Sequence, residues 1–533
     1  MSGFREPEIS REQMVLWSRR LDDAIPVDHP VRHVDELLHS EAFRDTFKEW
    51  ERLYMLVEGK PPYHPRDLAG LYLYGMMNRI RSSRQLEAAC YNRLDVIWLM
   101  SGQHPDHSTI AVFVAEHGPL LRQLFGDELK VSIRAGLVPL EYVSVDGTKL
   151  ESDAGKGSVH KKESMESYPG KLDEQIDQLQ GEWEANEKRE ASLFGSEVPW
   201  APKGEESLER RLESMKRKQE RLKEALASIQ RRKEENPHGK EPKAIASVTD
   251  PDSRVMRDKE GRSKPNYNLQ LAVDAAHGVI VATGASDAAE DSGQLTPMLE
   301  EVEKQCGKRP AEVSADSNYN TGAELAAVEA MEVVGYLPDS GANSGSCSKE
   351  PSAAESAVQA AHGGETLTDE QWSALPKDKE GRIEKAAFTY DAPKDVYRCP
   401  MGVSLPMLRT SQDQQKSGVV IRRQYGGCAE CATCVKASMC CKDPKKGRTV
   451  NRDQYEEHRE RLRVRMDTDI GRARYKLRRQ TVEPRFGLMK HNWGIRRFLR
   501  RGLESVHTEW VLICTAVNLG ILLKHWEVVK AMG

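Results

Sequence analysis

The sequence predicts an α/β fold in which helices accompany a mixed sheet, an α+β arrangement. The segment "EYVSVDGTKLES" (141–152) alternates, with Val143 and Val145 on one face of an expected strand. Between residues 264 and 338, further strand-like and helix-like stretches follow, so that the whole order is β-β-β-α-β-α-β. Residues 1–135 carry only helical patterns, which predicts a separate helical region before the sheet.

The helical region 1–135 is a candidate DNA-binding domain. "HPRDLAGLYLYGMMNRI" (64–80) has apolar residues at helical spacing, and Ser82 followed by Gln85 predicts a capping box at the start of the next helix. Four arginines lie around these short helices: Arg79, Arg81, Arg84 and Arg93. They indicate either contact with DNA or a helical bundle with solvated arginines, and both interpretations stay open.

Three further segments differ in composition from the predicted sheet. Residues 161–241 are charged and repeat apolar residues at heptad spacing, which predicts an inserted antiparallel helical hairpin. Residues 341–395 are rich in Gly, Ser, Ala and Glu, which predicts a flexible linker. Residues 396–445 hold six of the ten cysteines and form a cysteine-rich insertion.

Composition limits the classes of function. The chain has 533 residues and a formal net charge of −4, which excludes a uniformly basic nucleic-acid coat protein. "MSGFREPEISREQ" at the N-terminus has no apolar core, so we expect no signal peptide. "WVLICTAVNLGILL" (510–523) is too short to span a bilayer and contains Thr515 and Asn518, so it predicts a buried core helix.

The most basic stretch of the chain surrounds one acid. Between Arg472 and Arg501, Glu483 is the only carboxylate. On a continuous helix, Tyr475, Arg479, Glu483 and Lys490 would share one face within about 80° of arc. Pro484 disfavours helical geometry in the residue before it, so we expect a kink near Glu483.

Two aspartates occupy similar positions in the predicted sheet. Asp146 follows "YVSV" and Asp316 follows "EVSA", and each precedes a small or polar turn. Ends of strands are where α/β folds place their sites, although a single aspartate there is more often a cap or turn residue. Asp153, Asp250 and Asp252 also lie near expected strand ends, and for these we predict turn roles.

These motifs resemble those of a known family. "SVDGTKLES", "SADSNYNTGAEL" and the pattern from Tyr475 to Lys490 resemble the DDE-type bacterial insertion-sequence transposases, whose catalytic domain has the ribonuclease H-like fold. The run "TVEPRFGLMKHNWGIRRFLRRGLESVHTEWVLICTAVNLGILL" is similar to the final helices of that family. "LDDAIPVDHPVR" and "YHPRDLAGLYLYG" resemble its N-terminal helical domain. The family commonly has two residues between Tyr and Arg, so Arg478 or Arg479 is the motif arginine.

The resemblance implies a metal-dependent DNA strand-cleaving and strand-transferring enzyme. It implies a ribonuclease H-like catalytic domain built from residues 136–160, 242–340 and 470–525. Asp146, Asp316 and Glu483 would be the catalytic residues and the ligands of Mg²⁺ or Mn²⁺, because hard oxygen ligands suit these ions. Three clustered carboxylates would repel one another by roughly 4 kcal/mol per pair unless cations neutralise them. The expected DNA contacts are Lys149, Tyr475, Arg479, Lys490, Arg496 and Arg497.

The cysteines indicate a structural zinc site. Cys399, Cys431, Cys434 and Cys440 are the preferred set, because Cys399 begins a "CPMG" turn and the Cys-x2-Cys pair offers a second knuckle. This spacing also resembles that of related transposases. Cys428 or Cys441 in place of one member, or a reduced cluster without metal, are the alternatives.

The expected partner is double-stranded DNA, both transposon ends and target, bound by a homodimer or larger assembly in the bacterial cytoplasm. Two other functions stay open: a DNA-binding protein derived from a transposase that has lost catalysis, and a metal-dependent nuclease of the same fold that cuts without joining.

Overall fold

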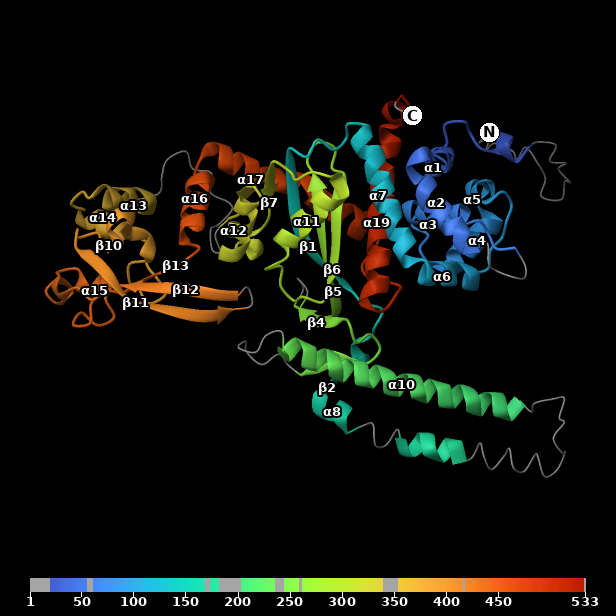
Figure 1. Ribbon diagram of the computed structural model, residues 1–533, viewed down its shortest axis with the longest axis horizontal. Helices are drawn as coiled ribbons and strands as arrows, with labels where there is room; N and C mark the ends of the chain where they lie inside the picture. Colours follow the sequence, from blue (N-terminus) through green and yellow to red (C-terminus); the bar gives the residue numbers. More distant parts are fainter. Residues whose placement is uncertain are drawn as a thin grey trace, which may run out of the picture.

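The computed structural model describes residues 20–54, 61–167, 173–181, 203–234, 244–257, 261–338, 353–415 and 418–531. The molecule is elongated, with the N-terminal helices at one end, a sheet in the middle and a second β-rich body at the other end (Figure 1). A pair of helices runs beneath the sheet in the same view. The N-terminal segment predicted to lack a signal peptide lies outside the described residues.

The N-terminal region is helical, as predicted. Its α-helices are α1 (Pro30–Leu38), α2 (Glu41–Tyr54), α3 (Pro65–Met77), α4 (Ser83–Asn92), α5 (Leu94–Leu99), α6 (His107–Glu116) and α7 (Gly118–Arg134). The capping box at α4 is confirmed, since Ser82 accepts from the Gln85 amide and the Gln85 side chain accepts from the Ser82 amide. Two of its arginines pair within the protein: Arg93 with Asp95, and Arg81 with the buried Glu509.

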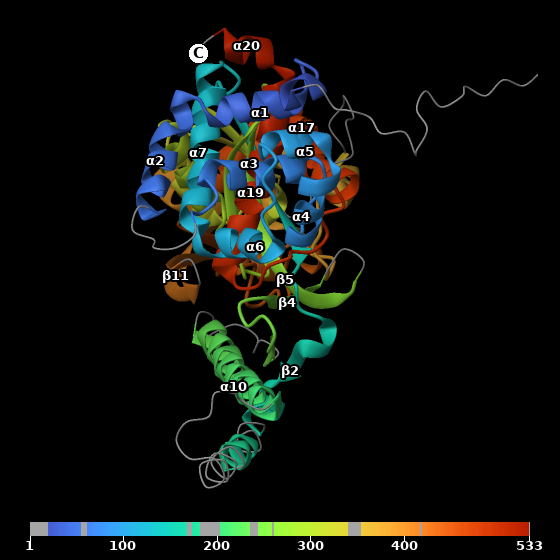
Figure 2. The same ribbon diagram turned by 90° about the vertical axis from the view of Figure 1, so that its right-hand side faces the viewer.

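A single apolar helix joins this region to the sheet. α19 (Leu503–Lys524) contacts α3 and α7 on one side and β6 (Ile280–Ser286) on the other. Figure 2 shows it among the N-terminal helices. By length and composition α19 resembles a membrane span, but 83% of its apolar window is buried inside the protein. It is the core helix that the sequence predicts, and one continuous apolar core unites the helices and the sheet.

The central sheet is mixed, as predicted. Its strands are β1 (Tyr142–Glu151), β4 (Arg254–Arg257), β5 (Ser263–Asp274), β6, β7 (Glu312–Ser314) and β8 (Val334–Tyr336). The order is β4-β5-β1-β7-β8, with β6 also paired to β5. β5 runs antiparallel to β1, whereas β7 and β8 run parallel to β1. The connecting helices α11 (Leu295–Cys306) and α12 (Gly322–Ala330) complete the predicted order of elements.

The predicted hairpin insertion leaves the sheet through a short two-stranded neck. β2 (Val159–Lys161) pairs antiparallel with β3 (Ile245–Ser247). Beyond the neck lie α8 (Lys162–Glu166), a helical segment at 173–181 and the long α10 (Lys203–Glu234). Gln219 on α10 donates a hydrogen bond to Asp173, which links the two long segments. Residues 182–202, where the predicted turn falls, lie outside the described residues.

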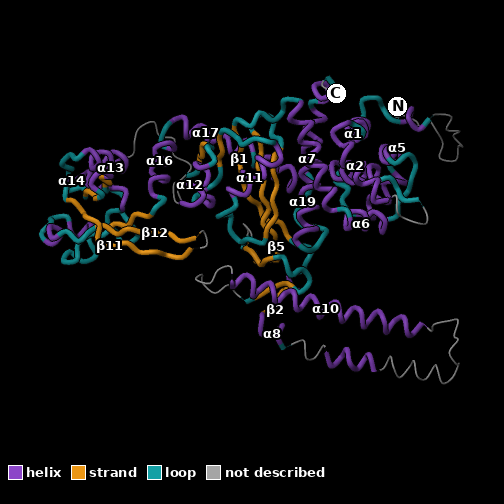
Figure 3. The backbone as a smooth tube through the Cα atoms, viewed as in Figure 1, coloured by secondary structure: helices purple, strands orange, loops and turns teal. Residues whose placement is uncertain are grey.

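The prediction of a flexible linker at 341–395 is wrong from residue 353 onward. Residues 353–453 form a second folded body. Its helices are α13 (Ala353–Gly363), α14 (Asp369–Ala374) and α15 (Ala437–Cys440). The strands are β9 (Thr389–Asp391), β10 (Val396–Arg398), β11 (Ser404–Gln415), β12 (Gly418–Tyr425) and β13 (Val450–Asp453), in the order β13-β12-β11-β10-β9. Ala357, Trp372 and Phe388 pack with Tyr397 and Tyr425 in a separate core. Figure 3 shows these strands apart from the central sheet.

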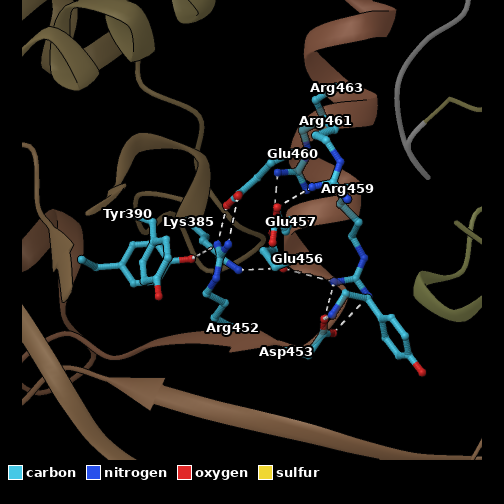
Figure 4. Close-up of polar contacts among 12 residues, drawn as sticks. Lys385, Tyr390, Arg452, Asp453, Glu456, Glu457, Arg459, Glu460, Arg461 and Arg463 are labelled. Atoms are coloured by element: carbon cyan, nitrogen blue, oxygen red, sulfur yellow. Dashed lines mark hydrogen bonds and ion pairs between the residues drawn. The ribbon is translucent and has the colours of Figure 1, made fainter. Parts of the chain in front are cut away.

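Ion pairs attach this second body to the rest of the protein. The Lys385 ammonium lies 2.9 Å from the buried Glu456 carboxylate, and Arg459 pairs with Asp453 at 2.9 Å (Figure 4). Glu456 begins α16 (Glu456–Met466), which is followed by α17 (Asp469–Thr481), α18 (Glu483–Gly487) and a π-helical turn at Leu488–Asn492. The chain ends with α20 (Trp526–Lys530). The basic stretch therefore leads from the second body back to the central sheet.

Candidate active site

Asp146 in β1 and Asp316 just past β7 stand at equivalent positions along two neighbouring parallel strands. The pairing of β1 with β7 ends at Ser144 and Ser314, whose hydroxyl oxygens lie 3.0 Å apart. Each aspartate comes two residues after its serine, and because side chains alternate along a strand, each returns to the face of that serine. The sheet topology therefore brings two acids that are far apart in sequence to one place.

The sequence predicts that Asp146 lies at the end of its strand, but in the structure it lies within the strand. β1 continues to Glu151 because its other edge stays paired with β5, where Asp146 stands opposite Leu271. Only the parallel pairing with β7 has ended. Asp316 does lie just past its strand, and its Oδ1 accepts a 2.8 Å hydrogen bond from the Asn318 amide. It thus caps a short 3₁₀ turn at Ser317–Tyr319.

Glu483 lies at the kink that Pro484 predicts. α17 ends at Thr481 and α18 starts at Glu483, with Val482 as the joint. Pro484 occupies the first turn of α18, where its missing N–H removes no helical hydrogen bond. The buried Val482 and Met489 anchor this segment in the core. The Glu483 side chain is about half exposed.

One arginine gathers the three acids. Nη2 of Arg478 lies 3.5 Å from Oδ1 of Asp146 and 3.8 Å from Oδ2 of Asp316, and its Nη1 lies 3.6 Å from Oε1 of Glu483. The Arg478 side chain is only 11% exposed. The three carboxylates, expected to be close from sequence alone, are therefore in one compact cluster. Arg478 makes these contacts, whereas the neighbouring Arg479 is exposed.

The cluster carries more negative charge than Arg478 balances. Burial raises the pKa of Asp146 to about 6; Arg478 opposes the rise, and Asp316 and Asp291 add to it. Burial also raises the pKa of Asp316, against hydrogen bonding from the Asn318 amide and the charge of Arg478. Additional positive charge would favour the ionised state of both carboxyls.

The set of oxygen atoms that the three acids offer suits Mg²⁺ or Mn²⁺. It consists of carboxylate oxygens, the ligands that these ions prefer. Over the described ranges, no three His, Cys, Asp or Glu side chains form a group that could hold a metal ion. The acids instead surround the guanidinium of Arg478, so divalent ions would compete with this group for the same oxygens.

The predicted DNA contacts lie on the elements that carry the acids. Nζ of Lys490 donates to the Thr148 hydroxyl and, at 3.1 Å, to the Lys149 carbonyl, both on β1. The Arg496 carbonyl accepts from the Glu151 amide at 3.2 Å, so this basic segment follows the end of β1. Arg496 and Arg497 are exposed, and Nη2 of Arg497 lies 3.6 Å from Asp153. Tyr475 is partly buried, one turn before Arg478 and Arg479.

The other acids near strand ends hold the final segment in place. Oδ1 of the buried Asp250 accepts from the Tyr267 hydroxyl at 2.7 Å and from the Gly502 amide at 3.0 Å. Oδ2 of Asp252 accepts from the Leu503 amide at 2.9 Å. These contacts position the start of α19.

Sequence reasoning missed a group of polar residues beside the acids. Asn268, Gln270, Tyr319 and Asp291 form a hydrogen-bonded network, and Gln270 is only 1% exposed. The signal was present in "NYNLQLAV" (266–273), where polar side chains alternate along the strand and every residue is buried. Amides on a fully buried strand need partners, which points to a polar site.

The cysteines of the second body also meet. Cys399, Cys431, Cys434, Cys440 and Cys441 line one small cavity. Sγ of Cys428 lies 2.8 Å from Sγ of Cys431. Burial raises the pKa of the Cys440 thiol to about 11. The predicted set of four lies together, but its sulfurs form no metal-binding group in the described part of the chain.

Two family models match the chain. Residues 398–523 match the model of a transposase DDE domain, and residues 19–116 match the model described as "Transposase domain (DUF772)". The first match contains Glu483 but neither Asp146 nor Asp316. No curated protein and no solved structure matches the chain.

Proposed function

The chain belongs to the DDE-type insertion-sequence transposases, and from this premise we propose that it cleaves DNA at the ends of a mobile element and joins those ends to a target. The observation that carries the proposal is the convergence of Asp146, Asp316 and Glu483 on Arg478. We further propose that the central sheet with α17 to α19 is the ribonuclease H-like catalytic domain implied by the resemblance. We also propose that the N-terminal helices bind DNA.

The acids would hold the divalent ions. Mg²⁺ or Mn²⁺ bound there supplies Lewis-acid activation of a water or 3′-hydroxyl and stabilises the leaving alkoxide. Asp146 and Asp316 would offer their oxygens just beyond the point where the pairing of β1 with β7 ends, and Glu483 would offer its own from the joint between α17 and α18. Arg478 neutralises part of the charge of the acids and keeps them gathered.

The basic residues around Glu483 would bring DNA to the acids. Lys490 is held against β1 at Thr148 and Lys149, and the exposed Arg496 follows the end of the same strand. Lys149, Arg496 and Arg497 would contact phosphates, and Tyr475 and Arg479 would border the same surface. Phosphate contacts position the substrate without selecting its sequence.

The test uses the full chain and a plasmid that carries the genomic DNA flanking the reading frame. We expect cleaved and joined products with Mg²⁺ or Mn²⁺, and loss of both in Asp146→Asn, Asp316→Asn and Glu483→Gln, with DNA binding retained. Glu457→Gln is the control, since its side chain is 71% exposed on α16. Full strand transfer by Glu483→Gln would contradict the assignment. Pre-cleaved ends that are never joined would indicate a nuclease instead.

We also propose that the second body binds one structural zinc ion through Cys399, Cys431, Cys434 and Cys440. The support is that all four line one cavity, which Cys441 also lines. Metal analysis of the purified protein should find about one zinc per chain, and serine at Cys434 should remove it. An equal zinc content in the two proteins would rule out this ligand set.

Joining requires two element ends, so we propose that the protein acts on double-stranded DNA as a dimer or larger assembly in the cytoplasm. Sedimentation of the chain with end-containing DNA should give a complex with two protein chains.

A further inference from the structure

Asp291 lies in the segment between β6 and α11, with its carboxylate turned to β5. Its Oδ1 accepts hydrogen bonds from Nδ2 of Asn268 and from Nε2 of Gln270, both at 2.9 Å. The Gln294 amide donates to the Asp291 carbonyl at 3.1 Å, which fixes the backbone of this turn. The carboxylate is therefore held in one position by two amides of a buried strand.

The same network reaches both aspartates of the proposed active site. The Tyr319 hydroxyl donates to Oε1 of Gln270, and Tyr319 ends the 3₁₀ turn that Asp316 caps. On the other side, a Cβ atom built on Gly147 would lie 2.5 Å from Oδ1 of Asp291. The Asp291 carboxylate thus lies directly against the backbone of the residue that follows Asp146. Because side chains alternate along β1, it lies on the opposite face of that strand from the Asp146 side chain.

The charge of Asp291 has no basic partner in the described part of the chain. Its hydrogen-bond donors are neutral amides, and its electrostatic influence falls on the acids. Burial is the main cause that raises the pKa of Asp146 and of Asp316, and the charge of Asp291 contributes in both cases. A fixed negative charge beside two other carboxylates is stabilised by bound cations.

We propose that the charge of Asp291, held behind Asp146 on the opposite face of β1, increases the affinity of the ion-binding site for divalent cations. This inference rests on the proposed function of Asp146, Asp316 and Glu483. Hydrogen bonding alone gives no reason for an acid at this position, because the Oδ1 of an asparagine accepts from the same two amides. What an asparagine lacks is the charge.

The test measures Mn²⁺ affinity of the full chain without DNA, by calorimetry and by the electron paramagnetic resonance of free Mn²⁺. Asp291→Asn should weaken binding about tenfold, as for other changes next to metal ligands. Glu290→Gln, which removes a charge from the exposed neighbouring side chain, should leave the affinity unchanged. Asp291→Glu, which keeps the charge, should bind more tightly than Asp291→Asn.

Asp146→Asn serves as the reference that separates the two proposals. If Asp146→Asn loses Mn²⁺ binding and a folded Asp291→Asn binds like the wild type, the role of Asp291 is refuted while the proposed function stands. If Asp146→Asn also binds like the wild type, the ion site itself is wrong and the role of Asp291 falls with it. Should Asp291→Asn fail to fold, Asp291→Glu decides, since weakening equal to that of Asp146→Asn would refute the role.

Discussion

Nδ2 of Asn518 on α19 donates a 2.9 Å hydrogen bond to Oε2 of Glu128 on α7, and both side chains are fully buried. The Ser132 hydroxyl donates to Oε1 of the same carboxylate at 2.7 Å. Asn518 also exchanges two 2.8 Å hydrogen bonds with the backbone of Ile280 on β6. The N-terminal helices, α19 and the central sheet are thus joined by one buried polar cluster.

This cluster should make stability depend on pH. Burial raises the pKa of Glu128 to about 7, against the hydrogen bonds from Ser132 and Asn518. Because the folded state disfavours the charged form, the free energy of unfolding should fall as the pH rises from 4.5 to 7. Relative to Glu128→Gln, the wild type should lose about 2–3 kcal/mol between pH 5 and pH 8, measured by urea unfolding.

Glu116→Gln is the matched control, since Glu116 is exposed on the neighbouring helix α6 and should leave the pH dependence as in the wild type. Parallel pH profiles for Glu128→Gln and the wild type would contradict the prediction.

Alanine at Gly147 should disrupt the site without unfolding the protein. Its Cβ would lie 2.5 Å from Oδ1 of Asp291 and 2.6 Å from Nε2 of Gln270, so this network must move. We expect a loss of stability of about 1–3 kcal/mol and a loss of DNA cleavage of at least tenfold. Gly155→Ala is the control, because nothing lies within 4 Å of its added Cβ. Equal cleavage by the two variants would show that the network does not position Asp146.

Local patterns in the sequence were sufficient to predict the order of the central elements, the core helix and the kink before Pro484. The same local patterns could not decide between Arg478 and Arg479. A face drawn on one continuous helix aligns Arg479 with Glu483, but α17 ends at Thr481 and the helix restarts at Glu483. In the structure Arg478, one residue earlier, is the residue that contacts the acids.

Other features depend on contacts between distant segments. The fold of residues 353–395 was missed because its core uses alanines and a few aromatic residues that pack on strands up to residue 450. The position of Asp146 within β1 depends on pairing with β5 across the hairpin insertion. The role of Asp291 depends on the same pairing, since Asn268 and Gln270 reach the site only in this register.

Removing Arg496 should weaken DNA binding in a salt-dependent manner. Arg496 is exposed, and its backbone lies beside the end of β1, a few residues before α19 begins. If it contacts one phosphate, Arg496→Ala should lower the slope of log affinity against log salt by about 0.9, for any DNA sequence. Arg217→Ala provides the control, because Arg217 is 70% exposed on the hairpin insertion. The two variants should be compared by fluorescence anisotropy over a range of salt concentrations, and identical slopes would exclude the Arg496 contact.

Removing Arg478 should strengthen the binding of divalent cations, whereas removing the charge of Asp291 should weaken it. Its guanidinium lies within 4 Å of all three acids and competes with divalent cations for their oxygens. Arg478→Gln should therefore tighten Mn²⁺ binding, by about three- to tenfold in the absence of DNA. DNA cleavage should nevertheless fall, because the acids lose the group that gathers them. Arg479→Gln removes the same charge from an exposed position one residue away, and its Mn²⁺ affinity, measured by calorimetry, should change little. Weaker Mn²⁺ binding by Arg478→Gln than by Arg479→Gln would mean that the arginine organises the ion site rather than competing for it.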